Sequence, residues 1–445
     1  MKIHRGLGTL GLVFILYFTT SGGPFTLETL VHEVGPGLAL LLLVLIPLIW
    51  SLPETLIVAE LASMMPVEGG YYRWVQRAFG NFWAFQNGWI TWMYSLVDMA
   101  LYPIVFNQYL RYFFPEMSRS VQWLVALAVI WGATAINLRG AVRVGWTSVV
   151  AGVFIVGTFL ALALASLPHA SHVPWVPFTS PGERQMGGLA VGMSIALWNY
   201  IGWDNASTVQ GEVKDAGRTY PRALAFALPL VTLGYLIPLV AALAASDWRT
   251  WTEGGWPQIA IASTGAIGPA LAFLIAIGAM ISQISLFNAL LLVYSRIPFV
   301  VASDGYLPRA LARTDARGTP RNAVLFAAVV YSAFVLIPFG HLLIADVLLY
   351  SFALMMEFGA LIVLRKREPE LRGSFRIPTG RGGVITLAAM PLVVLFFVIG
   401  VSFYDGEYGA PAIAGVVLAC IMGVVAYWIA RRLQPRLSSR TAPAE

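Results

Sequence analysis

The sequence predicts an all-α polytopic membrane protein with about twelve transmembrane helices, and its composition, hydropathy and apolar runs lead to this prediction. Hydrophobic residues make up 58% of the 445 residues, whereas charged residues make up only 11%. A soluble globular chain carries about 25% charged residues. The mean hydropathy of +0.75 leaves more apolar sequence than a water-soluble core buries, so the expected partner of this chain is a lipid bilayer.

Apolar runs of spanning length recur along the chain, and the segment before the first run is too short to be a cleaved signal, so we expect that run to be retained. The expected spans are 7–34, 37–65, 83–113, 120–138, 143–167, 186–211, 221–245, 269–302, 322–339, 345–364, 386–402 and 410–430.

The basic residues are distributed unevenly over the expected loops. Of the 28 Lys and Arg residues, 23 fall on one side, four (Arg111, Arg119, Arg184 and Arg249) fall on the other, and Arg296 lies at the inner end of the eighth span. The positive-inside rule therefore predicts that both termini are cytoplasmic, in the plasma (cell inner) membrane. The net charge of +6 is a topology signal, and no nucleic-acid partner is expected.

Two expected spans contain residues that disfavour a continuous helix. Residues 21–24 of the first span read Ser-Gly-Gly-Pro, and residues 198–205 of the sixth contain a glycine flanked by aromatic residues and a carboxylate. Interrupted segments at matching positions of two halves indicate a substrate site at the bilayer midplane. A kink that serves only helix packing is the alternative, because Gly and Pro are frequent in membrane helices.

Six acidic residues of the expected spans are functional candidates, and no Lys or Arg is expected beside them. They are Glu28, Glu54, Glu60, Asp98, Asp204 and Glu357. Such acids must be protonated, hydrogen-bonded to neighbouring groups or matched by a bound cation. Asp98, which shares a helix face with Tyr94 and Tyr102, is a candidate for handling substrate or a proton, as are Glu28 and Asp204. We expect Glu60 to brace the following loop.

Other polar residues give weaker signals. Ser282 and Ser285 of the eighth span could coordinate an ion, although hydroxyl groups more often join membrane helices. Cys420 is the only cysteine, so no intrachain disulfide is possible. No metal site and no cofactor are expected.

The breaks and the loop after the second span resemble those of the amino acid–polyamine–organocation (APC) superfamily. The matching residues are 59–61, Pro66, 69–71 and Gly80, with Ser21-Gly22-Gly23 at the place of the family's glycine-rich break. Further stretches resemble the polyamine uptake and L-type amino acid permease-like branch: 21–25 with Glu28, 85–89, Asp98 with 102–103, and 198–204.

The resemblance implies a five-plus-five inverted repeat, the leucine-transporter-like fold, with discontinuous helices 1 and 6 and two extra helices. Residues 1–167 would form the first repeat, 168–367 the second, 368–431 the two additional helices and 432–445 a cytoplasmic tail. Substrate would bind between helices 1, 3, 6, 8 and 10, and access would alternate. Proton-coupled relatives often carry a lysine in helix 5; helix 5 lacks one here, so proton coupling would run through a carboxylate.

We therefore predict a secondary active transporter, not an enzyme, that takes up a cationic amine, polyamine or amino acid, with H⁺ as the expected coupling ion. The predicted substrate-binding residues are Ser21, Gly22, Gly23, Phe25, Glu28, Asp98, Tyr102, Trp198, Asn199, Gly202, Trp203 and Asp204. The coupling candidates are Glu28, Asp98, Asp204, Ser282 and Ser285.

Two alternatives remain at this stage. A neutral amino acid permease or exchanger could share the fold, with structural acids. An intramembrane enzyme is a remote alternative: His341 and Asp346 have the His-x₄-Asp spacing of some acyltransferases, but we expect both in a short outer loop. The sequence contains no phosphate-binding loop of a pump and no filter-like repeat of a channel.

Overall fold

The computed structural model describes residues 5–180, 185–334, 340–402 and 409–433, which are helical apart from turns, loops and one β-bridge between Leu7 and Val213. Residues 1–4 of the predicted first repeat and most of the predicted tail, 434–445, lie outside the described residues. The helices up to the middle of the chain are α1 (Thr9–Thr20), α2 (Leu27–Val34), α3 (Pro36–Ile46), η1 (Pro47–Ser51), α4 (Leu52–Met64), α5 (Gly70–Phe79), α6 (Asn81–Leu110), α7 (Arg119–Asn137), α8 (Ala141–Ser166), η2 (Leu167–His169), α9 (Gln185–Trp198) and η3 (Asn205–Glu212).

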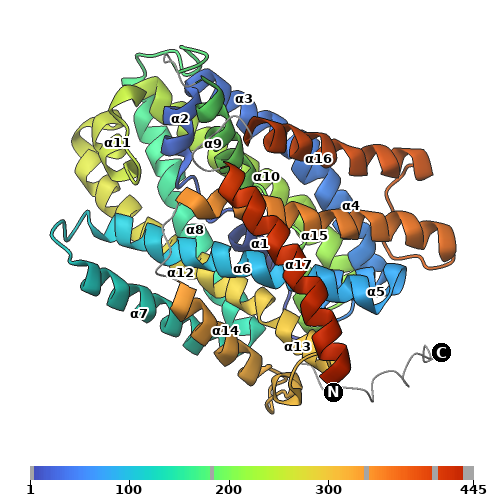
Figure 1. The fold of residues 1–445 in the computed structure, drawn as a ribbon. Helices are drawn as coiled ribbons and strands as arrows, with labels where there is room; N and C mark the ends of the chain where they lie inside the picture. Colours follow the sequence, from blue (N-terminus) through green and yellow to red (C-terminus); the bar gives the residue numbers. More distant parts are fainter. Residues whose placement is uncertain (1–4, 181–184, 335–339, 403–408, 434–445) are drawn as a thin grey trace.

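The remaining helices complete the bundle shown in Figure 1. They are α10 (Ala216–Ala245), η4 (Trp248–Thr250), α11 (Trp256–Ser263), η5 (Gly265–Ile267), α12 (Gly268–Tyr294), α13 (Arg296–Ser303), η6 (Arg309–Ala312), α14 (Arg321–Phe334), α15 (Gly340–Arg367), α16 (Arg381–Ser402) and α17 (Gly409–Leu433).

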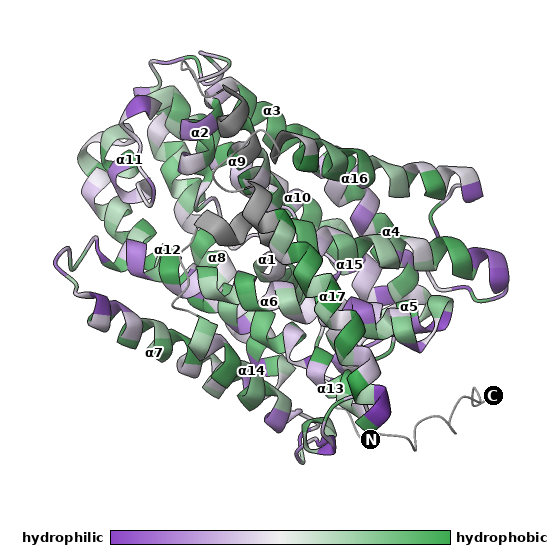
Figure 2. Ribbon diagram, viewed as in Figure 1, coloured by the Kyte–Doolittle hydropathy of each residue, from purple (hydrophilic) through white to green (hydrophobic). Residues whose placement is uncertain are grey.

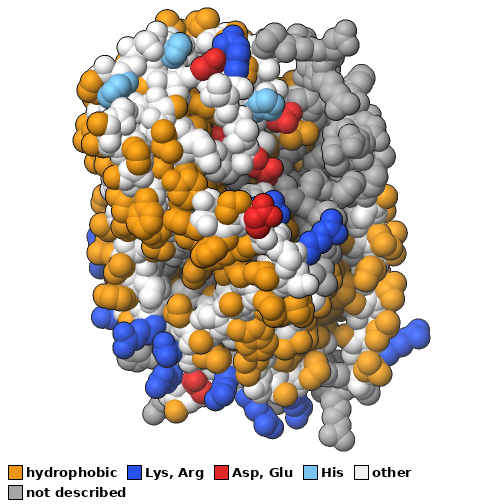
Figure 3. Space-filling view, turned by 90° about the vertical axis from the view of Figure 1, so that its left-hand side faces the viewer, with side chains coloured by type: hydrophobic (Ala, Val, Ile, Leu, Met, Phe, Trp, Pro, Cys, Tyr) orange, Lys and Arg blue, Asp and Glu red, His pale blue; other side chains and the backbone are white. Residues whose placement is uncertain are grey.

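Nine helical segments among the described residues are long and apolar enough to cross a membrane, and α1 and α14 are shorter apolar helices. Figure 2 shows hydrophobic residues along these helices and hydrophilic ones at their ends and in the loops. On the face seen in Figure 3, hydrophobic side chains cover the middle, and Lys and Arg gather along the lower edge. The chain is therefore a multi-pass helical membrane protein; the count of twelve spans stays a prediction.

Several helix boundaries differ from those predicted. The loops after the second and seventh predicted spans contain α5 and α11, which the sequence patterns did not indicate. The predicted eighth span is divided at Ser295 into α12 and α13. Asp346 was expected in an outer loop, and this prediction is wrong: the residue lies inside α15 and is 1% exposed. A short polar stretch is hard to distinguish from a loop when its polar side chain faces the protein interior.

The broken helices lie in the interior of the bundle. α1 packs against α8, α10 and α12, while α2 packs against α9. α6 packs against both α12 and α15. The segments between α1 and α2 and between α9 and η3 are consequently surrounded by other helices, where irregular backbone at membrane depth is tolerated.

Candidate functional site

The two predicted interruptions occur as non-helical segments, residues 21–26 and 199–204. Gly22 has φ of +71° and Gly202 has φ of +104°, a region that residues with a Cβ rarely adopt. At Gly202 the space also requires glycine, because a Cβ would lie 2.2 Å from the carbonyl oxygen of Thr19. The sequence thus brings the two breaks face to face, and the Thr19 hydroxyl donates to the Gly202 carbonyl at 3.4 Å.

A cavity opens beside the two breaks, which form its wall together with three helices. Residues from the first break, α6, the second break, α12 and α15 line it. They are Thr19, Thr20, Ser21, Tyr94, Asp98, Tyr102, Trp198, Asn199, Ile201, Gly202, Asn205, Leu286, Tyr294, Asp346 and Tyr350. The chain therefore converges here from regions that are far apart in sequence.

Two carboxylates of this cavity have different surroundings. Asp98 accepts hydrogen bonds from the Tyr102 hydroxyl at 2.5 Å and from the Tyr294 hydroxyl at 2.9 Å. Asp346 interacts electrostatically with Asp98, yet neither of its buried oxygens has a hydrogen-bond partner among the described residues. An ionised carboxylate that is buried without a partner costs several kcal/mol. Asp346 is therefore suited to a ligand that supplies positive charge and N–H donors.

Aromatic rings form much of the remaining wall. Tyr102 stacks on Trp198 with ring centroids 6.2 Å apart and an angle of 21° between the planes. Tyr94 makes edge contacts with Tyr294 and Tyr350, at 5.6 and 5.5 Å. Faces of such rings attract cations. The cavity thus combines carboxylates and aromatic faces, the two groups that favour an ammonium ion.

A second set of acids lies directly behind the cavity wall. Glu54 of α4 accepts from the backbone amide of Trp203 at 3.1 Å. The Tyr350 hydroxyl contacts both Glu54 and Asp204, at 2.5 and 2.6 Å. Glu357, one turn further along α15 than Ala353, interacts with the Asp204 carboxyl. We call Glu54, Asp204 and Glu357 the acid triad.

Other predicted site residues lie outside the cavity lining. Phe25 makes edge contacts with Tyr109 and Phe159. Glu28 accepts from the backbone amide of Gly254 at 2.9 Å, so it holds the loop between α10 and α11. Trp203 is buried, and its indole N–H donates to the Tyr200 carbonyl.

The predicted ion candidates lie between α12 and the first break. The Ser282 hydroxyl donates to the carbonyl oxygen of Gly22, and Ser285 is buried three residues further along α12. Gly23 donates its amide to the Ser21 hydroxyl at 3.1 Å. Within the described ranges, no three His, Cys, Asp or Glu side chains lie close enough together to hold a metal ion.

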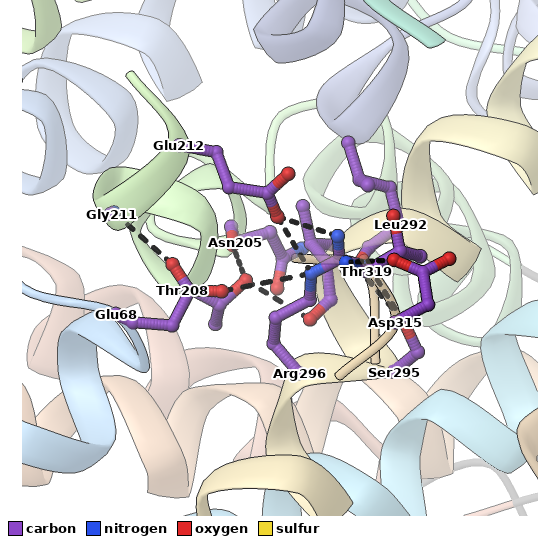
Figure 4. Close-up of polar contacts among 11 residues, drawn as sticks. Glu68, Asn205, Thr208, Gly211, Glu212, Leu292, Ser295, Arg296, Asp315 and Thr319 are labelled. Carbon is purple, nitrogen blue, oxygen red and sulfur yellow. Dashed lines mark hydrogen bonds and ion pairs between the residues drawn. The ribbon is translucent and has the colours of Figure 1, made fainter. Parts of the chain in front are cut away.

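Other acids, away from the cavity, pair with arginines at the start of α13 and near the end of α15. Arg296 is 0% exposed and lies between Glu212, at 2.5 Å, and Glu68, at 3.7 Å (Figure 4). The backbone carbonyl of Glu212 accepts the amides of Gly6 and Leu7, at 3.0 and 3.1 Å. Glu212 thereby joins the start of α1, the end of η3 and the junction of α12 and α13.

Glu68 lies in the turn between α4 and α5, outside the spanning helices, and accepts from the Gly211 amide at 3.1 Å. Burial, followed by the nearby charge of Glu212, raises the pKa of Glu68 to about 8, while Arg296 acts in the opposite direction. Glu60 forms a second buried pair, with Arg365 at 2.5 Å, and accepts from the Ile377 amide. The expectation that Glu60 lacks a basic partner is therefore wrong, because Arg365 reaches it from the end of α15.

Six of the predicted substrate-binding residues line the cavity: Ser21, Asp98, Tyr102, Trp198, Asn199 and Gly202. Sequence reasoning missed Tyr294, Asp346 and Tyr350. A signal for the last two was present, because Asp346 and Tyr350 repeat the Asp-x₃-Tyr spacing of Asp98 and Tyr102. That spacing places a carboxyl group and a phenol on one helix face.

Comparisons with known proteins agree with this architecture. The family model described as amino acid permease matches residues 7–427. The polyamine transporter PUT1 of Oryza sativa subsp. japonica is 33% identical over 401 residues, covering 89% of this chain and 74% of that protein. The polyamine transporter RMV1 of Arabidopsis thaliana is 32% identical over 423 residues, covering 94% and 84%.

A more distant relative is the methylthioribose transporter of Bacillus subtilis (strain 168), which is 24% identical over 375 residues and covers 80% of each chain. The family match spans nearly the whole described bundle, and the resemblance inferred from the two breaks is confirmed. The chain belongs to the amino acid permease family of the APC superfamily.

Proposed function

We propose that the protein is a secondary active transporter that takes up a cationic amine of the polyamine class together with protons. The observation that carries this proposal is Asp346, a buried carboxylate without a hydrogen-bond partner in the described structure, beside Asp98 on one cavity. A diamine or polyamine brings positive charge and several N–H donors. The names of the plant relatives support the same substrate class.

In this proposal one ammonium group lies between Asp98 and Asp346, and the Trp198 and Tyr102 rings cover the adjoining methylene groups. The aromatic faces add cation–π attraction of about 0.5–2 kcal/mol. Of the predicted residues that do not line the cavity, Gly22 and Gly23 shape the first break. Phe25 belongs to the first break, Glu28 lies beside it, and Trp203 belongs to the second break.

In this proposal the carrier lies in the plasma membrane with both termini in the cytoplasm. The cavity opens to each side in turn as the two five-helix repeats, 1–167 and 168–367, move relative to each other. The contact of Glu28 with Gly254 closes the cavity towards the outside, and the ion pair of Arg296 with Glu212 closes it towards the cytoplasm. Each contact would open in turn while the other holds.

Purified protein in liposomes tests the proposal. Radiolabelled putrescine and spermidine are expected to accumulate under an imposed inward proton gradient, without sodium, and Asp98→Asn and Asp204→Asn are expected to lower uptake. Sodium dependence would instead favour an ion between Gly22 and Ser282 as the coupling ion. Uptake of neither amine by the wild-type protein would contradict the proposal.

A neutral amino acid permease is the alternative function with the same fold. Such a permease would bind leucine or alanine, and the cavity acids would have no role in substrate recognition. Competition experiments in the same liposomes separate the two: excess leucine should leave putrescine uptake unchanged if the amine proposal is correct.

A further inference from the structure

The acid triad behind the cavity has a hydrogen-bonding pattern that requires an additional proton. The Tyr350 oxygen accepts the amide of Gly202 at 2.9 Å and lies 2.5 and 2.6 Å from carboxyl oxygens of Glu54 and Asp204. A tyrosine hydroxyl has one proton and two acceptor positions. Its proton serves one carboxyl group, and the Gly202 amide occupies one acceptor position. The other carboxyl group must then donate to the remaining position, so it carries a proton.

Glu357 supplies an independent sign of protonation. Its side chain is 0% exposed, and within the described residues no N–H or O–H group donates a hydrogen bond to either carboxyl oxygen. The groups that face it are the Asp204 carboxyl and the Asn87 side chain. The Asn87 amide group already donates to the Ala353 carbonyl at 3.1 Å, and its Oδ1 has no donor. A proton on Glu357 would supply the donor that Asn87 Oδ1 lacks.

The surroundings of the triad contain acids and phenols rather than bases. Tyr71, Tyr94, Tyr220 and Tyr350, from α5, α6, α10 and α15, are the further titratable groups that interact with it. In the described part of the chain no Lys, Arg or His forms an ion pair with any triad member. Neutralisation of the triad therefore depends on protons.

We infer that the acid triad, with Glu357 and Glu54 as members besides Asp204, is the site of the coupled proton. Tyr350 belongs both to the triad's hydrogen bonds and to the cavity wall, so it links proton binding to amine binding. Asp98 and Asp346 are neutralised by the amine, and the triad is neutralised by protons. Because buried net charge is costly, the closed carrier crosses readily only when both have bound, and this makes uptake a symport.

The inference rests on the proposed function and is tested with Glu357→Gln in liposomes. In the wild type, putrescine accumulates under a proton gradient and also exchanges with putrescine inside the vesicle. Glutamine resembles the permanently protonated acid, so exchange is retained and gradient-driven accumulation is lost. Gradient-driven accumulation equal to that of the wild type would overturn the inference and leave the proposed function intact.

Asp346→Asn is the matched control, because it removes a buried carboxyl from the same helix but from the cavity side. It should raise the putrescine concentration needed for half-maximal exchange while accumulation still follows the proton gradient. Asp204→Asn serves as a second triad variant if Glu357→Gln does not fold.

Infrared difference spectra provide a readout that does not depend on transport. The wild type minus Glu357→Gln should contain the C=O stretching band of a protonated carboxyl group. Absence of this band from the wild-type spectrum, and from the wild-type minus Asp204→Asn difference spectrum, would mean that the triad is fully ionised. That result would contradict the proposed proton site. Failure of the wild type to exchange any amine, with the band present, would overturn the proposed function instead.

Discussion

The buried acids at the end of η3 and in α4, Glu212 and Glu60, differ from those at the cavity in what neutralises them. Glu60 and Glu212 each contact an arginine at 2.5 Å, and the Ile377 amide also donates to Glu60. Within the described residues, Asp98, Asp346 and the acid triad have no arginine or lysine partner: they contact tyrosine hydroxyls, the Trp203 amide or one another, and Asp346 has no hydrogen-bond partner. The paired acids are complete as they stand and join helices. The unpaired acids require a cation or a proton from outside the chain.

The comparison also separates two meanings of an intramembrane carboxylate. Such a residue is a functional candidate by default, but an arginine at hydrogen-bond distance changes the expectation to a structural role. Removal of one partner of a buried pair leaves an uncompensated charge. Removal of an unpaired acid takes such a charge away. The same kind of substitution should therefore destabilise one region and spare the other.

The largest effect is expected from Arg296→Met. It leaves the Glu212 carboxylate buried without its cation, which should destabilise the protein by about 3–5 kcal/mol. Thermal unfolding of the detergent-solubilised protein measures this. The double variant Arg296→Met with Glu212→Leu should recover much of the loss, and wild-type melting of the single variant would contradict the pairing argument.

A smaller effect, on binding rather than stability, is expected from Asp346→Asn. Loss of a charged hydrogen bond to an ammonium group should weaken amine binding by about 1.5–3 kcal/mol, or roughly 10- to 150-fold. The melting temperature should stay equal or rise, because an unpartnered buried charge is removed. Competition binding of spermidine measures the first effect, with Glu253→Gln in the loop between η4 and α11 as control. An Asp346→Asn variant that is less stable than the wild type and binds spermidine with unchanged affinity would contradict the comparison.

The aromatic wall is expected to contribute less. Trp198→Leu removes the stacked partner of Tyr102 and should weaken amine binding by about 0.5–2 kcal/mol. Trp198→Phe keeps an aromatic face and should lose less. If both variants bind spermidine equally, the ring packs the cavity without attracting the cation.

The smallest effect is a pH dependence of stability that arises from Glu68, in the turn between α4 and α5. With the pKa of Glu68 raised from 4.5 to about 8, the folded protein holds a proton between these values that the unfolded chain releases. The contribution of Glu68 to stability is therefore fullest below pH 4.5 and is lost as pH rises through about 8. Glu68→Gln should flatten this part of the melting curve against pH. If the melting temperature of the variant changes with pH as steeply as that of the wild type, Glu68 is not the source of the pH dependence.

The sequence predicted the membrane class and both helix breaks because glycine, proline and hydropathy act locally. It also predicted Asp98, Tyr102 and Trp198 on the cavity, since they flank the breaks or share a helix face. It could not predict that Arg365 reaches Glu60 across 305 positions, or that Glu28 faces the Gly254 amide. Those contacts depend on how distant helix ends meet. Asp346 was misplaced for a local reason, because a polar stretch near the start of a helix resembles a loop in the sequence.

Equilibrium binding of radiolabelled spermidine to the purified wild type and to the double variant Asp98→Asn with Asp346→Asn tests the central claim most directly. The account predicts saturable binding to the wild type, displaced by putrescine and not by leucine, and its loss in a double variant that melts at or above the wild-type temperature. Unchanged spermidine binding in that folded double variant, or displacement by leucine, would contradict it.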